Sequence, residues 1–201
     1  MPARDEPKHK VALENNYVRV IDVQIPAGTQ TLYHVHDIPS VIVYLTKSTN
    51  ETQIFGESTW TPRTIGPGDS RYAPYDEKPL THRVRNPGPG LFHVYDIELL
   101  HAPLTAEAFA LPDSPALHEH WKQKAVRSVT LRLDGGGHRT IAPSACAYLI
   151  VAITGTLTIS SPNGAPCDLR PQEFSFQPAQ SGFLLSNGGD TPLEAVVLEL
   201  K

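Results

Sequence analysis

Three histidines in the first half of the chain have the residue type and the spacing of metal ligands. His34 and His36 are separated by one residue within residues 31–36, which have a β-strand pattern. Because side chains alternate along a strand, both imidazoles would lie on one face and could reach one metal ion together. His82 begins a second predicted strand and joins the pair if its face points inward. Neutral imidazole binds iron, nickel, zinc, copper and manganese, so the three side chains predict a transition-metal site.

The elements that must position these histidines are short strands. The 19 Pro and 14 Gly favour many strands joined by turns over long helices. Before residue 100, segments rich in β-branched and aromatic residues alternate with turn residues. The predicted strands there are residues 17–25, 31–36, 41–46, 52–55, 70–73, 82–85 and 91–99. Their spacing predicts an all-β sandwich or small barrel.

The pattern changes after residue 100, where we predict a helical connector. Ser114 and Pro115 are residue types preferred at the N-cap and at the first helical position, and residues 116–124 follow without a breaker. Thr105 would cap a shorter helical turn over residues 106–111, which a proline ends.

Strand signals then resume and repeat the first series. The predicted strands are residues 128–133, 140–141, 146–153, 157–160, 173–177, 183–186 and 193–200. Four motifs recur in the same order, roughly 100 residues apart, which indicates an internal duplication. The matched segments are 42–46 with 150–154, 67–69 with 171–173, 86–88 with 187–189, and 97–99 with 198–200. We therefore expect an N-terminal domain (1–100), a helical connector (101–125) and a C-terminal domain (126–201).

The first histidine motif resembles the opening of the first cupin motif, in which a glycine is followed after five residues by His-x-His. Gly28 and His34-Val35-His36 fit this opening. The family usually has a glutamate four or five residues later, where this chain has Ser40 and Val41. Lys47 replaces the glycine that normally closes the motif.

The second cupin motif is similar to a later stretch of the chain. Gly68-Asp69, Pro74, His82 and Asn86 fit it, with an extra stretch at residues 75–81. Together the two motifs identify the chain as a member of the cupin superfamily. The resemblance implies an all-β protein of two tandem cupin domains (RmlC-like jelly-roll β-barrels).

The second copy lacks the ligands. The first two histidines align near Ala142 and Ser144, and Phe183 takes the place of His82. The only histidine of this copy, His138, follows three glycines in a turn region. The C-terminal cupin is therefore expected to be degenerate and structural.

Other polar residues of the first half are ambiguous. His93 and Tyr95 share one face of their predicted strand and would line the pocket or pack in the core, depending on which face points inward. By the same alternation, Arg83 and Arg85 should face away from the metal. Asp69 follows a glycine in a turn, so turn stabilisation is its expected role.

A second close pair of histidines lies in the predicted helix. His118 and His120 would point about 200° apart there, so they could not share a metal ion and are expected to be solvated. Cys146 and Cys167 lie in the copy without ligands, and we expect two free thiols with no catalytic role.

The missing glutamate guides the functional hypothesis. Neutral ligands leave the metal its full charge, which favours an anionic, chelating substrate. Three-histidine cupin sites of this kind resemble non-haem iron dioxygenases that act on β-diketones, thiols or gentisate-like aromatic acids. The resemblance implies that His34, His36 and His82 hold Fe(II), with substrate and dioxygen at the remaining positions. No motif identifies a catalytic residue among the side chains.

Other hypotheses remain open at this stage. One is a non-redox isomerase-type or hydrolase-like cupin that uses zinc, manganese or nickel to polarise a carbonyl. Another is a small-molecule or metal-binding cupin without activity, which would show no oxygen uptake. A barrel whose histidines are satisfied by hydrogen bonds is the third.

Composition limits the partners. The net charge of −4, without a Lys/Arg cluster, argues against nucleic acid and anionic membranes. The polar N-terminus and the absence of a run of 18 apolar residues predict a soluble, cytoplasmic protein. The expected partners are a small-molecule substrate and a second copy of the chain, because cupin barrels often form homodimers through edge strands.

Overall fold

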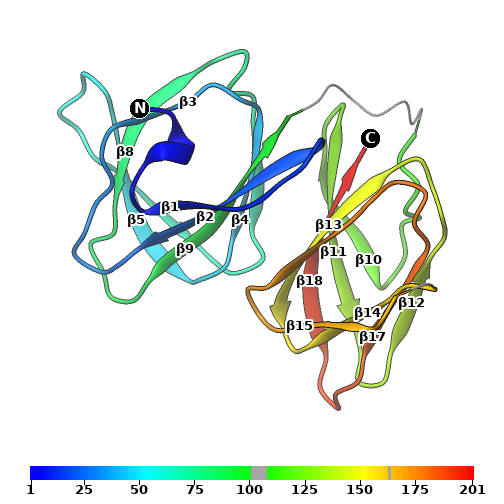
Figure 1. The fold of residues 1–201 in the computed structure, drawn as a ribbon. Coiled ribbons are helices and arrows are strands. Elements are labelled where there is room, and N and C mark those ends of the chain that lie inside the picture. Colours follow the sequence, from blue (N-terminus) through cyan, green and yellow to red (C-terminus); the bar gives the residue numbers. More distant parts are fainter. Residues whose placement is uncertain (101–107, 163) are drawn as a thin grey trace. The chain divides into compact units, whose positions relative to one another are not determined.

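The computed structural model describes residues 1–100, 108–162 and 164–201, and the chain divides into two compact units, Met1–His101 and Ala102–Lys201. Both units are built from β-strands (Figure 1). The one helical element among the described residues is a single 3-10 turn, η1 (Ala3–Asp5). The predicted all-β fold class is therefore confirmed.

The first unit contains two antiparallel sheets. Its strands are β1 (His9–Glu14), β2 (Val18–Ile25), β3 (His34–His36), β4 (Ser40–Tyr44), β5 (Ser48–Ile54), β6 (Thr61–Ile65), β7 (Ser70–Ala73), β8 (Leu80–Arg85) and β9 (Phe92–Leu99). The five-stranded sheet has the order β1-β2-β9-β4-β7, and the four-stranded sheet has the order β3-β8-β5-β6. In Figure 1 the strands of this unit, drawn from blue to green, curve around a common interior.

The second unit repeats this strand order. Its strands are β10 (Leu117–Lys122), β11 (Val126–Leu133), β12 (His138–Ile141), β13 (Ala147–Thr154), β14 (Leu157–Ser160), β15 (Cys167–Leu169), β16 (Phe174–Gln177), β17 (Phe183–Asn187) and β18 (Leu193–Leu200). The sheets have the orders β10-β11-β18-β13-β16 and β12-β17-β14-β15. Each strand of the first unit thus has a counterpart at the same place in the second unit.

Side chains from both sheets fill the interior of the first unit. The buried cluster consists of Ile21, Val23, Ile25, Ile42, Tyr44, Ile65, Phe92 and Val94, with Val84 packed against it. Burying an aliphatic or phenyl side chain of this size contributes about 1.5–3 kcal/mol, so the cluster holds the two sheets together. Strand alternation on β9 places Phe92 and Val94 in this interior, whereas His93 and Tyr95 point to the opposite face.

The predicted helix over residues 116–124 is wrong, because this segment forms strand β10. β10 pairs antiparallel with β11 and has a bulge between Glu119 and Trp121. Leu117 is fully buried, while His118 and His120 are exposed on the strand. Pairing with β11 and burial of Leu117 outweigh the modest helix propensity of the segment. The predicted helical connector is therefore not present in residues 108–125.

Ser114 has a turn role rather than the predicted N-cap role. Its backbone exchanges two hydrogen bonds of 3.0 Å with Leu117, and its Oγ accepts a third from the Leu117 N–H at 3.2 Å. This tight turn leads the chain into β10. The shorter helical turn predicted over residues 106–111 lies partly outside the described residues, and residues 108–111 are not helical.

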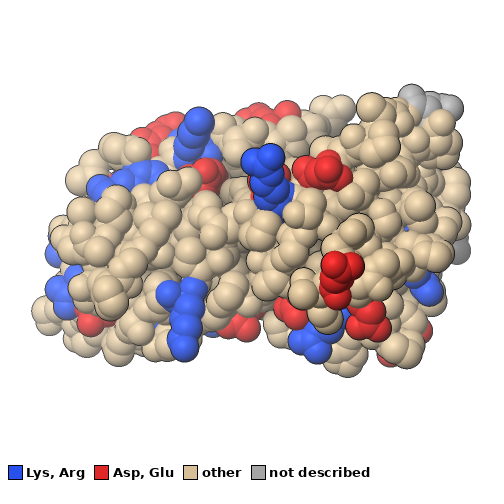
Figure 2. Space-filling view, turned by 90° about the horizontal axis from the view of Figure 1, so that it is seen from below, with Lys and Arg blue, Asp and Glu red and all other residues tan. Residues whose placement is uncertain are grey.

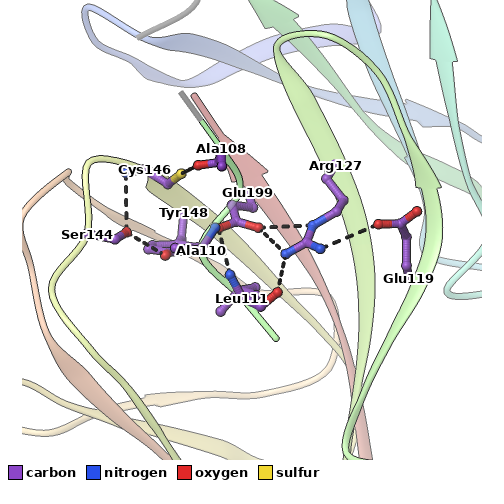
Figure 3. Close-up of polar contacts among 9 residues, drawn as sticks. All are labelled: Ala108, Ala110, Leu111, Glu119, Arg127, Ser144, Cys146, Tyr148 and Glu199. Atoms are coloured by element: carbon purple, nitrogen blue, oxygen red, sulfur yellow. Dashed lines mark hydrogen bonds and ion pairs between the residues drawn. The ribbon is translucent and has the colours of Figure 1, made fainter. Parts of the chain in front are cut away.

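A buried ion pair fastens the segment before β10 to the second barrel (Figure 3). Arg127 on β11 donates from Nε to Glu199 Oε2 on β18 at 3.0 Å and from Nη2 to the Leu111 carbonyl at 2.6 Å. The backbone N–H groups of Ala110 and Leu111 donate to the other oxygen of Glu199.

Burial raises the pKa of the nearby Cys146 thiol to about 11, which keeps it protonated and unreactive.

The surface carries both signs of charge. On the face drawn in Figure 2, Lys and Arg side chains lie among Asp and Glu side chains rather than in a separate zone. In the part of the chain that the structure describes, no helix is long and apolar enough to span a membrane.

Candidate metal centre

The three predicted ligands meet inside the first barrel. β3 and β8 pair antiparallel with His34 directly opposite His82, and His36 lies two residues along the same face of β3. One ring nitrogen from each of the three histidines lies within 4.8 Å of the other two. All three side chains are buried, and their ring centroids are 4.7 to 5.0 Å apart. The pairing register thus gathers three ligands from two adjacent strands.

Burial keeps His34 and His82 neutral in this interior. Burial, followed by the neighbouring His9 and His36, lowers the pKa of His34 to about 3. Burial, followed by His36 and His34, lowers the pKa of His82 to about 2. His34 Nδ1 donates to the Leu32 carbonyl at 2.9 Å in the tautomer that leaves Nε2 with a free lone pair. Neutral imidazole with an available lone pair is the form that binds a metal ion.

These histidines line a small pocket between the two sheets. The cavity volume is about 80 Å³, measured as the space open to the centre of a water molecule. Its lining also includes His9, Tyr44, Asn50, Thr52, Arg63, Arg71, Tyr75 and Asp96, together with the apolar side chains of the barrel interior. One water needs roughly 10–15 Å³ by this measure, so the pocket has room for a small ligand.

Several buried polar atoms of the pocket have no hydrogen-bond partner. Among the described residues, eight buried side-chain N and O atoms lack a hydrogen bond, and six of them belong to four residues of the pocket. They are His36 Nδ1, Asn50 Nδ2, both ring nitrogens of His82 and both carboxylate oxygens of Asp96. Buried polar atoms are rarely left unpaired, since each costs about 1–3 kcal/mol. Their concentration fits a site that binds a metal ion and a polar ligand.

Comparison with known proteins identifies the fold. No family model matches the chain, and no curated protein matches it. Among solved structures, AerE from Microcystis aeruginosa is 13% identical, with a TM-score of 0.68 and coverage of 98% of each chain. A cupin 2 conserved barrel domain protein from Leptotrichia buccalis is 12% identical, with a TM-score of 0.62 and coverage of 100% of this chain and 91% of that chain. The chain has a cupin fold.

A third similar structure contains a metal. Bacterial pirin YhhW from Escherichia coli, in complex with nickel(II), is 15% identical, with a TM-score of 0.64. The match covers 96% of this chain and 90% of that chain. At these identities, the comparison establishes the cupin fold of this chain and leaves its chemistry to its own residues.

Sequence reasoning missed Asp96, which lies beside the histidines in the cupin barrel. Asp96 Oδ2 is 3.1 Å from His36 Nδ1, although the contact is not aligned as a hydrogen bond. Asp96 lies on the inward face of β9, in line with Phe92 and Val94. Its signal in the sequence was an acidic residue on the same face of the predicted strand as two apolar residues, Phe92 and Val94.

His93 and Tyr95 lie on the face of β9 that points away from the pocket. Neither residue lines the pocket. His93 is buried, and its Nε2 lies 2.7 Å from Asp22 Oδ1 on the neighbouring strand β2. The two residues therefore have a packing role on the outer side of the five-stranded sheet.

The chain's first residues also reach the pocket, which the sequence did not indicate. His9 at the start of β1 lines it, with its ring centroid 4.7 Å from that of His34. His9 Nδ1 lies 2.6 Å from the Ala3 carbonyl, and the buried Glu6 carboxylate accepts a hydrogen bond from the Leu32 N–H at 3.0 Å. The N-terminal segment thus closes one side of the histidine cluster.

Of four arginines in the first cupin barrel, two line the pocket and two lie outside it. Arg83 and Arg85 lie outside the pocket lining, and both guanidinium groups stack on the Trp60 ring. Arg71 and Arg63 line the pocket instead. Neither had been singled out from the sequence.

The second cupin barrel has apolar residues where the first has ligands. Ile141 lies opposite Phe183 on β12 and β17, just as His34 lies opposite His82. The counterpart of His34 is therefore Ile141, one residue before the predicted Ala142. Ile141 and Phe183 belong to a buried apolar cluster.

The second barrel also has an apolar residue in place of Asp96. Asp96 pairs with Ile42 on β4, and Val197 pairs with Ile150 at the matching place in the second barrel. The second barrel thus forms with an aliphatic side chain at this position and needs no polar group there for its architecture.

Proposed function

We propose that this chain is a bicupin whose first barrel binds one divalent transition metal through His34, His36 and His82. We further propose that it is a mononuclear non-haem enzyme, with Fe(II)-dependent dioxygenase as the leading activity and a small chelating molecule as substrate. The second barrel would be a degenerate cupin without a metal.

The observation that carries this proposal is the contrast between the two barrels. The first barrel buries imidazole nitrogens and a carboxylate without hydrogen-bond partners. The second barrel has Ile141, Phe183 and Val197 at the matching positions. An unpaired buried polar group costs free energy that an apolar side chain does not, so selection for folding alone would not retain these groups. A metal ion would give one of the two ring nitrogens of His82 its partner.

The donor set fits a catalytic metal better than a structural one. Three neutral ligands from two adjacent strands occupy part of a coordination sphere, and an open position is typical of catalytic sites. When bound, Fe(II) would supply the redox chemistry by which dioxygen reacts with an organic substrate. The chain's own residues would bind and orient the substrate in the pocket and exclude water from it.

A non-redox reaction with zinc, manganese or nickel is the second candidate, and Asp96 favours it. A buried carboxylate whose two oxygens have no hydrogen bond, beside the site, can accept a proton from a substrate. A reaction of the isomerase type would use Asp96 in this way, whereas an oxygenase would use it only to orient His36.

The metal content tests the proposal. Protein expressed without a His-tag should contain about one metal ion per chain by elemental mass spectrometry, and His34→Ala/His36→Ala should lose it. The exposed pair offers a matched control, because His118→Ala/His120→Ala removes the same groups outside the site and should retain the metal.

The identity of the metal then separates the candidates. Iron, followed by oxygen uptake with a chelating substrate, would support the dioxygenase. Activity only with zinc, manganese or nickel, and without oxygen uptake, would support the non-redox enzyme. No metal after anaerobic reconstitution would contradict the proposal, and a metal without turnover of any tested compound would reduce it to a binding protein.

A further inference from the structure

The pocket contains a half-buried cation without an anionic partner. Arg71 on β7 donates from Nε to the Tyr44 hydroxyl at 3.1 Å and from Nη2 to the Tyr75 hydroxyl at 3.3 Å. Both partners are neutral phenols. Among the described residues, no carboxylate oxygen lies within 4.0 Å of the Arg71 guanidinium. A charge that is partly withdrawn from water is usually paired, so the pocket places an uncompensated positive charge beside the histidines.

Asp96 does not supply the missing charge. Arg71 and Asp96 lie on either side of Ile42 across three adjacent strands. Strands are spaced by about 4.8 Å, so the two backbones are about 10 Å apart. The same pocket thus has a positive group toward β7 and a negative group toward β9.

A second, independent observation points to the same ligand chemistry. Asn50 on β5 is buried and lines the pocket, and its Nδ2 has no hydrogen-bond partner. Its neighbour across the sheet is Arg63, which also lines the pocket. Asn50 therefore adds an unused N–H donor to the charge of Arg71. Planar N–H donors of this kind match the two oxygens of a carboxylate.

We propose that Arg71 and Asn50 bind the carboxylate of a small organic acid whose other end faces the three histidines. The reaction of this acid rests on the function proposed above, whereas its binding does not need the metal. Asp96 repels the carboxylate from the β9 side, so the acid has one preferred orientation. This assignment selects acids over uncharged diketones among the candidate substrates.

The test uses two small compounds of nearly the same shape. Pyruvate and pyruvamide both carry adjacent C=O groups, but only pyruvate has a carboxylate. Binding to the full chain is measured by ligand-observed NMR, first after metal removal with EDTA and then after metal loading. We expect the metal-free protein to bind pyruvate at least about tenfold more tightly than pyruvamide, because charge-assisted hydrogen bonds act only on the acid.

Variants locate the binding group. Arg71→Met removes the cation, and Asn50→Asp replaces the amide with a carboxylate of nearly equal size in the pocket lining. Each should weaken pyruvate binding at least about tenfold and change pyruvamide binding far less. Arg83→Met is the matched control, since Arg83 lies outside the pocket and donates to Gln53 at 2.7 Å. It should bind pyruvate like the parent protein.

The outcomes separate this inference from the proposed function. Preference for pyruvate without any metal binding would support the acid site and overturn the metal enzyme. Metal binding with equal affinity for both compounds would overturn the acid site and leave the metal centre. The comparison of the two compounds in the parent protein decides the matter even if Arg71→Met does not fold.

Discussion

His36 Nδ1 and Asp96 Oδ2 lie 3.1 Å apart in the interior of the first barrel, between strands of different sheets. A carboxylate at Nδ1 favours the tautomer with a proton on that nitrogen and leaves Nε2 to bind a metal ion. Such partners of metal-binding histidines fix the orientation of the ring and raise its basicity. The contact therefore links the five-stranded sheet to the proposed metal site.

Replacing this carboxylate should weaken metal binding. Asp96→Asn keeps the shape of the side chain but removes its charge, and we expect metal affinity to fall by about 10- to 100-fold. Competition with a fluorescent chelator measures the change. Asp22→Asn is a control, because Asp22 pairs with His93 on the other face of the sheet. Equal affinities of Asp96→Asn and the parent protein would show that Asp96 does not support the metal.

The stability of the metal-free protein should fall in mild acid. Burial holds the pKa of His34 at about 3 and that of His82 at about 2, whereas an unfolded histidine has a pKa of about 6.5. As the pH falls below about 6.5, only the unfolded chain takes up these protons. The free energy of unfolding then decreases by up to about 1.4 kcal/mol per pH unit for each histidine.

Denaturant titrations in EDTA between pH 7 and pH 4.5 would measure this dependence. His82→Phe installs the residue of the second barrel and removes one of the two titrating groups, so its stability should depend less steeply on pH. A variant with the same pH dependence as the parent protein would show that His82 does not titrate as described.

The sequence predicted the all-β class and the convergence of the three histidines. Both depend on strand alternation and on local motifs around His34, His36 and His82. Whether these side chains bind a metal stays a prediction. Strand pairing brings the groups together, and a register cannot be derived from the local sequence of one strand.

Register also explains what was missed. Asp96 and Arg71 are isolated polar residues in strands whose inward face becomes known only from their neighbours. Strand β1, which delivers His9, lies in a polar stretch with weak alternation. The wrong helix at β10 has the same cause, because Leu117 and Trp121 fit a helical and a strand pattern equally well until the pairing with β11 is known.

Replacing polar residues of the first barrel with their counterparts from the second should abolish metal binding and raise the stability of the metal-free protein. The variant His34→Ile/His82→Phe/Asp96→Val places the residues of the second barrel at matching positions. It removes four of the unpaired buried atoms, each of which costs about 1–3 kcal/mol. We expect it to unfold at a higher temperature than the metal-free parent protein and to bind no metal. A lower unfolding temperature would indicate that these polar groups contribute to folding.

Breaking the buried pair of Arg127 and Glu199 should strongly destabilise the second barrel. Glu199 is fully buried and accepts hydrogen bonds from Arg127 and from two backbone N–H groups. Glu199→Leu leaves the Arg127 charge without its main partner, which typically costs about 3–5 kcal/mol. Guanidinium denaturation followed by circular dichroism would measure the loss.

A surface pair of the same barrel provides the comparison. Arg132 and Glu194 lie 3.0 Å apart, with the arginine side chain 72% exposed, and such pairs contribute about 0–1 kcal/mol. Glu194→Leu should therefore change the free energy of unfolding far less than Glu199→Leu. Similar losses in the two variants would mean that burial does not determine the strength of the Arg127–Glu199 pair, and that residues 110 and 111 are held to the barrel by other contacts.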